Sequence, residues 1–148
     1  MGLIAGGVYP VFENVFKVGV EGKASSESDM KPIADVETFS VSFDDNVEEW
    51  TPMTTKGWRR ALKTGKAFTV SLSGKRNIGD EGNDYVAGLA FKTGQDCETR
   101  FEWVLPDGTT VKVGCIVNIT GGGGDSTNVD GLDFEVMSNG EPTVTAAG

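Results

Sequence analysis

Residues 99–115 read TRFEWVLPDGTTVKVGC, and this stretch decides the fold. At its centre, Pro106 suits the first position of a turn, and Gly108 suits the left-handed position of a three-residue loop. Such a loop pairs Leu105 with Thr109. The pairs that follow are Trp103 with Val111, Phe101 with Val113, Thr99 with Cys115 and, on the opposite face, Glu102 with Lys112. Because the apolar side chains then share one face, turn chemistry and burial predict the same antiparallel hairpin.

Other segments outward from this hairpin also alternate between apolar and polar residues, which indicates half-buried strands. They are residues 14–20, 36–43, 67–73 and 129–137. Residues 80–94 break this pattern, since apolar side chains recur there at helical spacing, with Asp80 or Asn83 as the N-cap and Gly94 at the end. We therefore predict a mainly β fold, a β-sandwich or barrel of two antiparallel sheets with one short flanking α-helix.

Composition limits the function. The chain has 148 residues, enough for one domain spanning residues 1–148, and its 21 glycines favour tight turns between short strands. A net charge of −9 argues against a surface that clamps nucleic acid with Lys and Arg. The absence of histidine removes the usual general base and the commonest metal ligand. We expect no enzymatic activity, no catalytic residue, no cofactor and no metal, and no apolar run is long enough to span a membrane.

A glycine-rich segment late in the chain resembles a ligand site only superficially. Residues 121–124 are all glycine but lack the Lys-Ser/Thr of a phosphate-binding loop, so we expect a flexible connector between strands. The oxygen-bearing side chains that follow do not have the spacing of an EF-hand; they are Asp125, Asn128, Asp130 and Asp133. Turn capping is their expected role, and a weak Ca²⁺ site is the open alternative.

Charge is segregated along the chain. Residues 21–49 contain nine acids, whereas residues 56–76 contain seven bases and no acid. Two patches of opposite sign suit head-to-tail association of copies, and the alternative is neutralisation within one subunit. Trp50 and Trp58 flank a polar segment, which indicates either an interface loop or packing against the core. The candidate interface residues are Asp44, Asp45, Glu48, Glu49, Trp50, Met53, Lys56, Trp58, Arg59, Arg60 and Lys63.

Three segments in order resemble the tail tube (major tail) proteins of long-tailed bacteriophages and phage-tail-like particles. They are residues 58–76, WRRALKTGKAFTVSLSGKR, then 83–87, NDYVA, and 105–108, LPDG. The resemblance covers most of residues 33–137 and implies stacked rings of six copies that enclose an acid-lined channel for DNA. It also implies that an N-terminal arm (1–13), an inter-strand loop (44–57) and a C-terminal tail (138–148) order on stacking.

The resemblance implies further partners and a location. The chain would associate with itself and with other tail proteins, such as tape measure and terminator proteins, while DNA passes without specific binding. It would be made in the host cytoplasm and reside in the virion tail or a related particle. The alternatives are a monomeric β-sandwich module that recognises a carbohydrate or a protein, and a contractile-system inner tube or effector-delivery ring. Trp50, Trp58 and Trp103 could form the aromatic platform of such a binding module, although the predicted pairing places Trp103 in the core.

Overall fold

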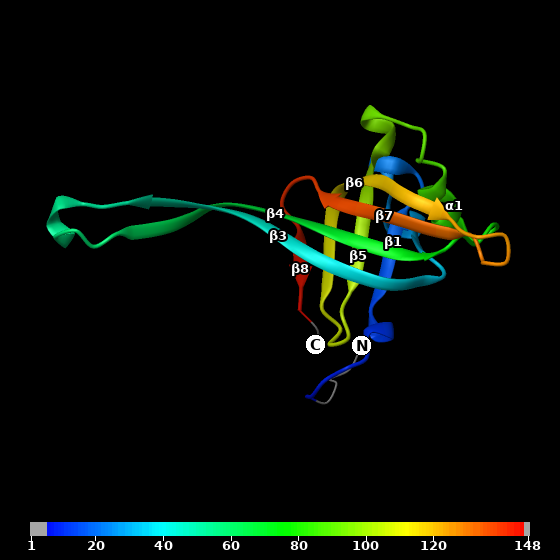
Figure 1. Ribbon diagram of the computed structural model, residues 1–148, viewed down its shortest axis with the longest axis horizontal. Helices are drawn as coiled ribbons and strands as arrows, with labels where there is room; N and C mark the ends of the chain where they lie inside the picture. Colours follow the sequence, from blue (N-terminus) through cyan, green and yellow to red (C-terminus); the bar gives the residue numbers. More distant parts are fainter. Residues whose placement is uncertain (1–5, 147–148) are drawn as a thin grey trace.

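Eight strands form one antiparallel sheet in the computed structural model, which describes residues 6–146 (Figure 1). Seven strands follow the order β2-β1-β5-β6-β7-β4-β3, and β8 pairs with β6. Their bounds are β1 Val15–Gly19, β2 Met30–Pro32, β3 Val36–Trp50, β4 Arg60–Lys75, β5 Glu98–Val104, β6 Thr110–Gly123, β7 Gly131–Ser138 and β8 Thr143–Thr145. The helices are α1 Glu81–Ala87 and the 3₁₀ turns η1 Val11–Glu13, η2 Gly22–Ala24, η3 Glu27–Asp29, η4 Met53–Thr55 and η5 Gly94–Cys97. The mainly β class with a single short α-helix is confirmed.

The hairpin of β5 and β6 has the predicted pairing. The Leu105 amide donates to the Thr109 carbonyl at 2.8 Å, and Gly108 has a left-handed φ of 88°. The strands then pair Trp103 with Val111, Phe101 with Val113, and Thr99 with Cys115. Local turn chemistry therefore fixed which residues of these two strands face the core.

Strand β6 joins the two antiparallel sheets that the sequence predicted into one sheet. Its first half pairs with β5 and β8, and its second half, from Cys115 onward, pairs with β7. The expected two separate sheets are therefore a single sheet that bends at β6, with a register shift between Ile119 and Gly121. The prediction of a flexible connector at 121–124 is also wrong for residues 121–123, because these residues extend β6 and pair with β7. An added Cβ on Gly122 would lie 2.9 Å from the Gly131 carbonyl oxygen, so glycine permits this close backbone approach.

The sheet curls until strands far apart in its order share one core. The rings of Phe16 on β1 and Phe39 on β3 pack edge to face with centroids 4.8 Å apart, and Trp103 packs against both rings. One cluster of buried apolar residues fills this core, with members on the inward faces of the strands, at Ile33 after β2 and on the segment containing α1. They are Phe16, Val18, Ile33, Phe68, Val70, Leu72, Val86, Leu89, Phe101, Val113, Cys115, Val117, Leu132, Phe134 and Val136.

The helix α1 is shorter than predicted, because it ends at Ala87 and turns continue after it. Asp80 is the N-cap, as expected, and its carboxylate accepts from the Asn83 amide at 3.0 Å. Asn83 does not cap the helix. Its side chain is buried and bonds to the Ala34 and Lys75 carbonyls at 3.1 and 3.0 Å, which fastens the helix to the base of the β3–β4 hairpin.

The hairpin of β3 and β4 projects from the rest of the molecule, called the body here, as a long two-stranded arm (Figure 1). The arm is defined as residues 44–66. The sequence predicted an inter-strand loop at 44–57, but β3 continues to Trp50 and β4 starts at Arg60. The predicted C-terminal tail contains β8, and the predicted N-terminal arm contains η1, while residues 1–5 of that arm and 147–148 of that tail lie outside the described residues.

Candidate subunit interface

The arm is a regular antiparallel ribbon with one irregularity. Its partners run from Asp44 opposite Ala67 to Trp50 opposite Arg60, with a register shift between Asn46 and Val47. At ~3.3 Å per residue, the seven strand residues 44–50 extend roughly 23 Å from the body. The arm has no further strand on either side among the described residues.

The tip of the arm, residues 51–59, is a tight reversal. It contains η4, and then Lys56 and Gly57 take left-handed conformations with φ of 54° and 93°. The Thr55 hydroxyl stabilises the reversal by bonding to the Pro52 and Trp58 carbonyls at 2.9 and 2.7 Å. The tip is therefore a defined structure and not an open loop.

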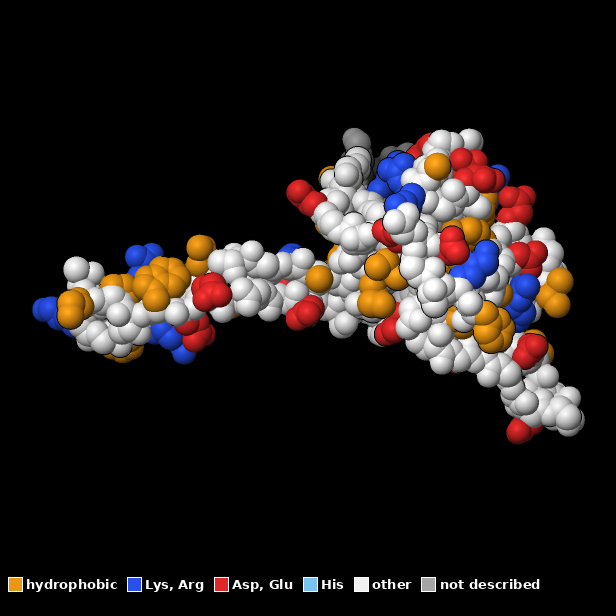
Figure 2. All heavy atoms as spheres, turned by 90° about the horizontal axis from the view of Figure 1, so that it is seen from above, with side chains coloured by type: hydrophobic (Ala, Val, Ile, Leu, Met, Phe, Trp, Pro, Cys, Tyr) orange, Lys and Arg blue, Asp and Glu red, His pale blue; other side chains and the backbone are white. Residues whose placement is uncertain are grey.

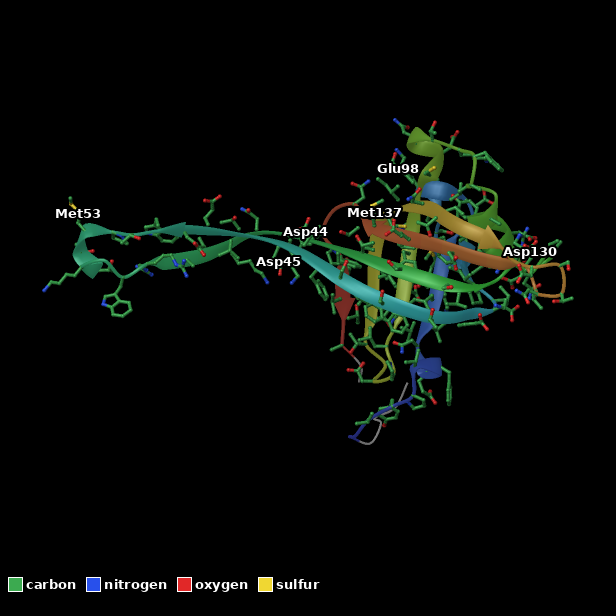
Figure 3. All side chains as sticks on the ribbon, in the orientation of Figure 1. Asp44, Asp45, Met53, Glu98, Asp130 and Met137 are labelled. Carbon is green, nitrogen blue, oxygen red and sulfur yellow. The ribbon has the colours of Figure 1, made fainter. Side chains whose placement is uncertain are left out.

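Large apolar side chains on the arm face solvent. The exposed fraction is 43% for Trp50, 98% for Met53 and 80% for Trp58, and Val47 and Leu62 are also exposed. Figure 3 shows Met53 at the far end of the arm, away from the body. Packing of the two tryptophans against the core, one of the two sequence interpretations, is therefore wrong.

Several acids and bases of the arm pair with each other within one chain. Asp45 contacts Lys63 at 3.1 Å and Lys66 at 3.8 Å, and Glu49 contacts Arg59 at 3.2 Å. The hydrogen bond and the charge of Asp45 raise the pKa of Lys63. These pairs agree with the interpretation that the charged segments neutralise each other within a subunit.

The remaining charged side chains of the arm lack such an ion pair. Within residues 6–146, Asp44, Glu48 and Lys56 form no ion pair, and the Arg60 guanidinium lies 6.0 Å from the centre of the Trp50 ring. Figure 2 shows hydrophobic and basic side chains gathered on the outer part of the arm. The tip, residues 51–59, together with Arg60 carries three bases and no acid.

The body has a groove that sequence reasoning missed. It lies between β1 and the start of β3 and has a volume of about 460 Å³. Its lining residues are Val11, Phe12, Asn14, Val15, Phe16, Pro32, Ile33, Asp35, Val36, Glu37, Thr38 and Phe39. Apolar side chains form most of this lining, and Asp35 and Glu37 add carboxylates. No local pattern could reveal the groove, because the curl of the sheet brings β1 next to β3.

The aromatic platform of a binding module is not formed. The Trp103 ring packs on Phe16 and Phe39 in the core, and its Nε1 donates to the Asn14 side chain at 2.9 Å. Trp50 and Trp58 lie on the arm instead. The three tryptophans therefore do not share a surface.

The cysteines and acids of the body form neither a reactive nor a metal-binding arrangement. Cys97 and Cys115 are buried free thiols, and burial raises the pKa of Cys115 to about 12. Asp133 accepts a hydrogen bond from the Ser73 hydroxyl at 2.6 Å. The part of the chain from residue 6 to 146 contains no cluster of three or more metal-ligating side chains and no helix long and apolar enough to cross a membrane.

Solved structures with the same fold include chains from gene transfer agent particles. One is a chain from the tail of an empty gene transfer agent particle, determined by helical refinement with C6 symmetry. It matches with a TM-score of 0.73 and 17% identity, covering 94% of this chain and 100% of that one. Another, from the virion of a native gene transfer agent particle, has a TM-score of 0.69 and 16% identity with the same coverage. No protein-family model and no curated protein matches the chain.

The resemblance to tail tube proteins is therefore confirmed at the level of the fold. Along nearly its whole length, the chain shares its fold with a chain from the tail of a gene transfer agent particle.

Proposed function

We propose that this chain is a structural subunit, and not an enzyme, that assembles with copies of itself into the tube of a phage-like tail. In this proposal the subunits form six-membered rings that stack around a channel through which DNA passes. The shared fold supports the proposal, since one matching chain belongs to a tail with C6 symmetry. Synthesis in the host cytoplasm, location in the virion tail, and contacts with other tail proteins such as tape measure and terminator proteins complete the proposal.

The arm is the observation that carries this proposal. A two-stranded ribbon is at best marginally stable in water, and exposed apolar patches of this kind mark interaction sites. Here Met53 and Trp58 lie at the end of such a ribbon, far from the chain's own core. A second copy that covers the arm explains why these side chains are kept exposed in a single subunit.

One face of the body suits the wall of a DNA channel. The outward side chains of β3, β4, β7 and the second half of β6 are mostly hydroxyls, amides and carboxylates. They include Ser40, Ser42, Thr69, Ser71, Ser73, Asn118, Thr120, Asp133 and Glu135. Residues 38–44, 69–73, 116–120 and 132–137 contain no Lys or Arg. The acids within these ranges repel phosphates, and Lys75 at the end of β4 is paired with Glu37 at 3.2 Å, so such a face favours sliding of DNA over binding.

Electron microscopy of the purified full chain tests the proposal. We expect tubes or six-fold rings with an open centre in negative stain as the protein concentration is raised. Sedimentation velocity on the same samples measures the fraction assembled. A chain that stays monomeric at every concentration, also with crowding agents, would refute self-assembly, and rings of another symmetry would refute only the six-fold part.

A further inference from the structure

We infer that the groove between β1 and β3 is the receptor for the arm tip of a second copy. This inference rests on the proposed self-assembly and adds to it the surface that receives the arm. The groove lies beside the edge strand β3, and its lining includes exposed apolar side chains of η1. The arm tip, residues 51–59, is the part of the chain that we expect to fill this groove on another copy.

The first argument is apolar complementarity. Met53 and Trp58 are exposed at the tip, and the groove lining combines buried rings such as Phe16 with exposed side chains such as Phe12. Residues that anchor protein interfaces are typically tryptophans and other large side chains that fill a pocket on the partner. A groove of about 460 Å³ lies within the range of pockets that hold inserted groups of this size.

The second argument is charge. The arm has four acids and five bases, so it is slightly basic in a chain whose net charge is −9. Lys56 and Arg60 lie at its end, whereas Asp35 and Glu37 line the groove. Glu37 also contacts Lys75 at 3.2 Å, but that pair is solvent-exposed and contributes little, so it does not prevent a contact with Lys56 of another copy.

The third argument is reach, which makes the contact intermolecular. Glu37 and Trp50 lie at opposite ends of the same extended strand, 13 residues apart, which corresponds to roughly 40 Å. A tip at the far end of β3 cannot reach the groove at the start of β3 while the strand stays extended. Docking of the tip into the groove of another copy is a heterologous contact, which repeats from copy to copy into closed rings or open filaments.

Photo-crosslinking in the full-length protein tests this inference directly. Met53 is replaced by a benzophenone amino acid, assembled samples are irradiated, and crosslinked peptides are identified by mass spectrometry. We expect crosslinks between copies that join position 53 to residues 11–16 or 32–39. The same amino acid in place of Phe91, a fully exposed ring on the body, is the matched control and should not crosslink to the groove. Crosslinks from position 53 that map elsewhere, in samples that still assemble, overturn the inference and leave the proposed function intact.

A charge-reversal cycle provides a second readout. Lys56→Glu and Glu37→Lys should each weaken assembly about ten-fold, because each juxtaposes like charges, and the double variant should recover most of the loss. Lys92→Glu, which changes the same charge on an exposed part of the body, should leave assembly unchanged. Two losses that simply add in the double variant would overturn the pairing of tip and groove. A chain that never associates overturns both this inference and the proposed function.

Discussion

Removal of the arm should abolish assembly and leave the body folded. In the variant, residues 45–66 are replaced by Asn-Gly. Asp44 and Ala67 face each other in the register of β3 and β4, so a two-residue turn can join them. None of the replaced residues is buried. The free energy of unfolding of the body should therefore change by less than about 1 kcal/mol, the scale of surface substitutions away from special contacts.

The expected loss of assembly is much larger. Full burial of a large apolar side chain contributes about 1.5–3 kcal/mol, so covering Met53 and Trp58 contributes roughly 3–6 kcal/mol for each arm. Because 1.4 kcal/mol corresponds to a factor of ten, the association constant should fall by about two to four orders of magnitude. The protein concentration at which tubes first appear should rise by a similar factor. At the concentrations at which the wild-type protein assembles, we therefore expect no tubes of the variant.

Two measurements decide between the possible outcomes. Sedimentation velocity and electron microscopy follow assembly, and urea unfolding monitored by tryptophan fluorescence follows the body through Trp103, which the variant retains. Assembly of the variant at the wild-type concentration would refute the assignment of the arm as an interface. Loss of a cooperative unfolding transition would instead show that the arm supports the body, contrary to the burial pattern.

Other predictions concern the body. Asn83→Ala removes the side-chain hydrogen bonds that fasten α1 to the sheet and should lower the free energy of unfolding by about 2–3 kcal/mol in urea titration. Gly74→Ala should destabilise by about 1–3 kcal/mol, because the new Cβ overlaps the Asp35 carbonyl oxygen, whereas the control Gly114→Ala has its nearest contact at 3.4 Å and should be nearly neutral. The thiol of Cys115, with a pKa raised to about 12 by burial, should not react with a thiol reagent at pH 8 until the protein is unfolded, and rapid native labelling of Cys115 would contradict the packing of the core.

The parts of the fold that depend on local chemistry could be predicted from the sequence. The β5–β6 hairpin is the clearest case, because the turn at Pro106 and Gly108 and the apolar face containing Phe101 require the same pairing. The start of α1 followed similarly from the capping ability of Asp80. In each case the residues that determine the structure lie within a few positions of each other.

The arm could not be predicted as strand for a physical reason. Alternation of apolar and polar residues records burial of one face, and neither face of residues 44–50 is buried in the single chain. The same segment therefore has the composition of a loop although its backbone pairs fully with β4. Residues 121–123 were missed for a related reason, because the backbone of β7 and not a side-chain pattern keeps these glycines in the sheet.

The ion pairs within the arm change the interpretation of the charge segregation. Asp45 with Lys63 joins β3 to β4, and Glu49 with Arg59 joins β3 to the tip, so these solvent-exposed pairs make small contributions that favour the observed register of a ribbon without a core. Charged side chains along exposed strands also oppose indiscriminate edge-to-edge pairing. Two of the four acids of the arm, Asp45 and Glu49, are thereby paired within the subunit. Within residues 6–146, the bases of the arm that form no ion pair are Lys56 at the tip and Arg60, and they lie beside the exposed apolar side chains. Recognition of another copy is then concentrated at the end of the arm, which separates the residues that fold the subunit from those that we expect to join it to the next.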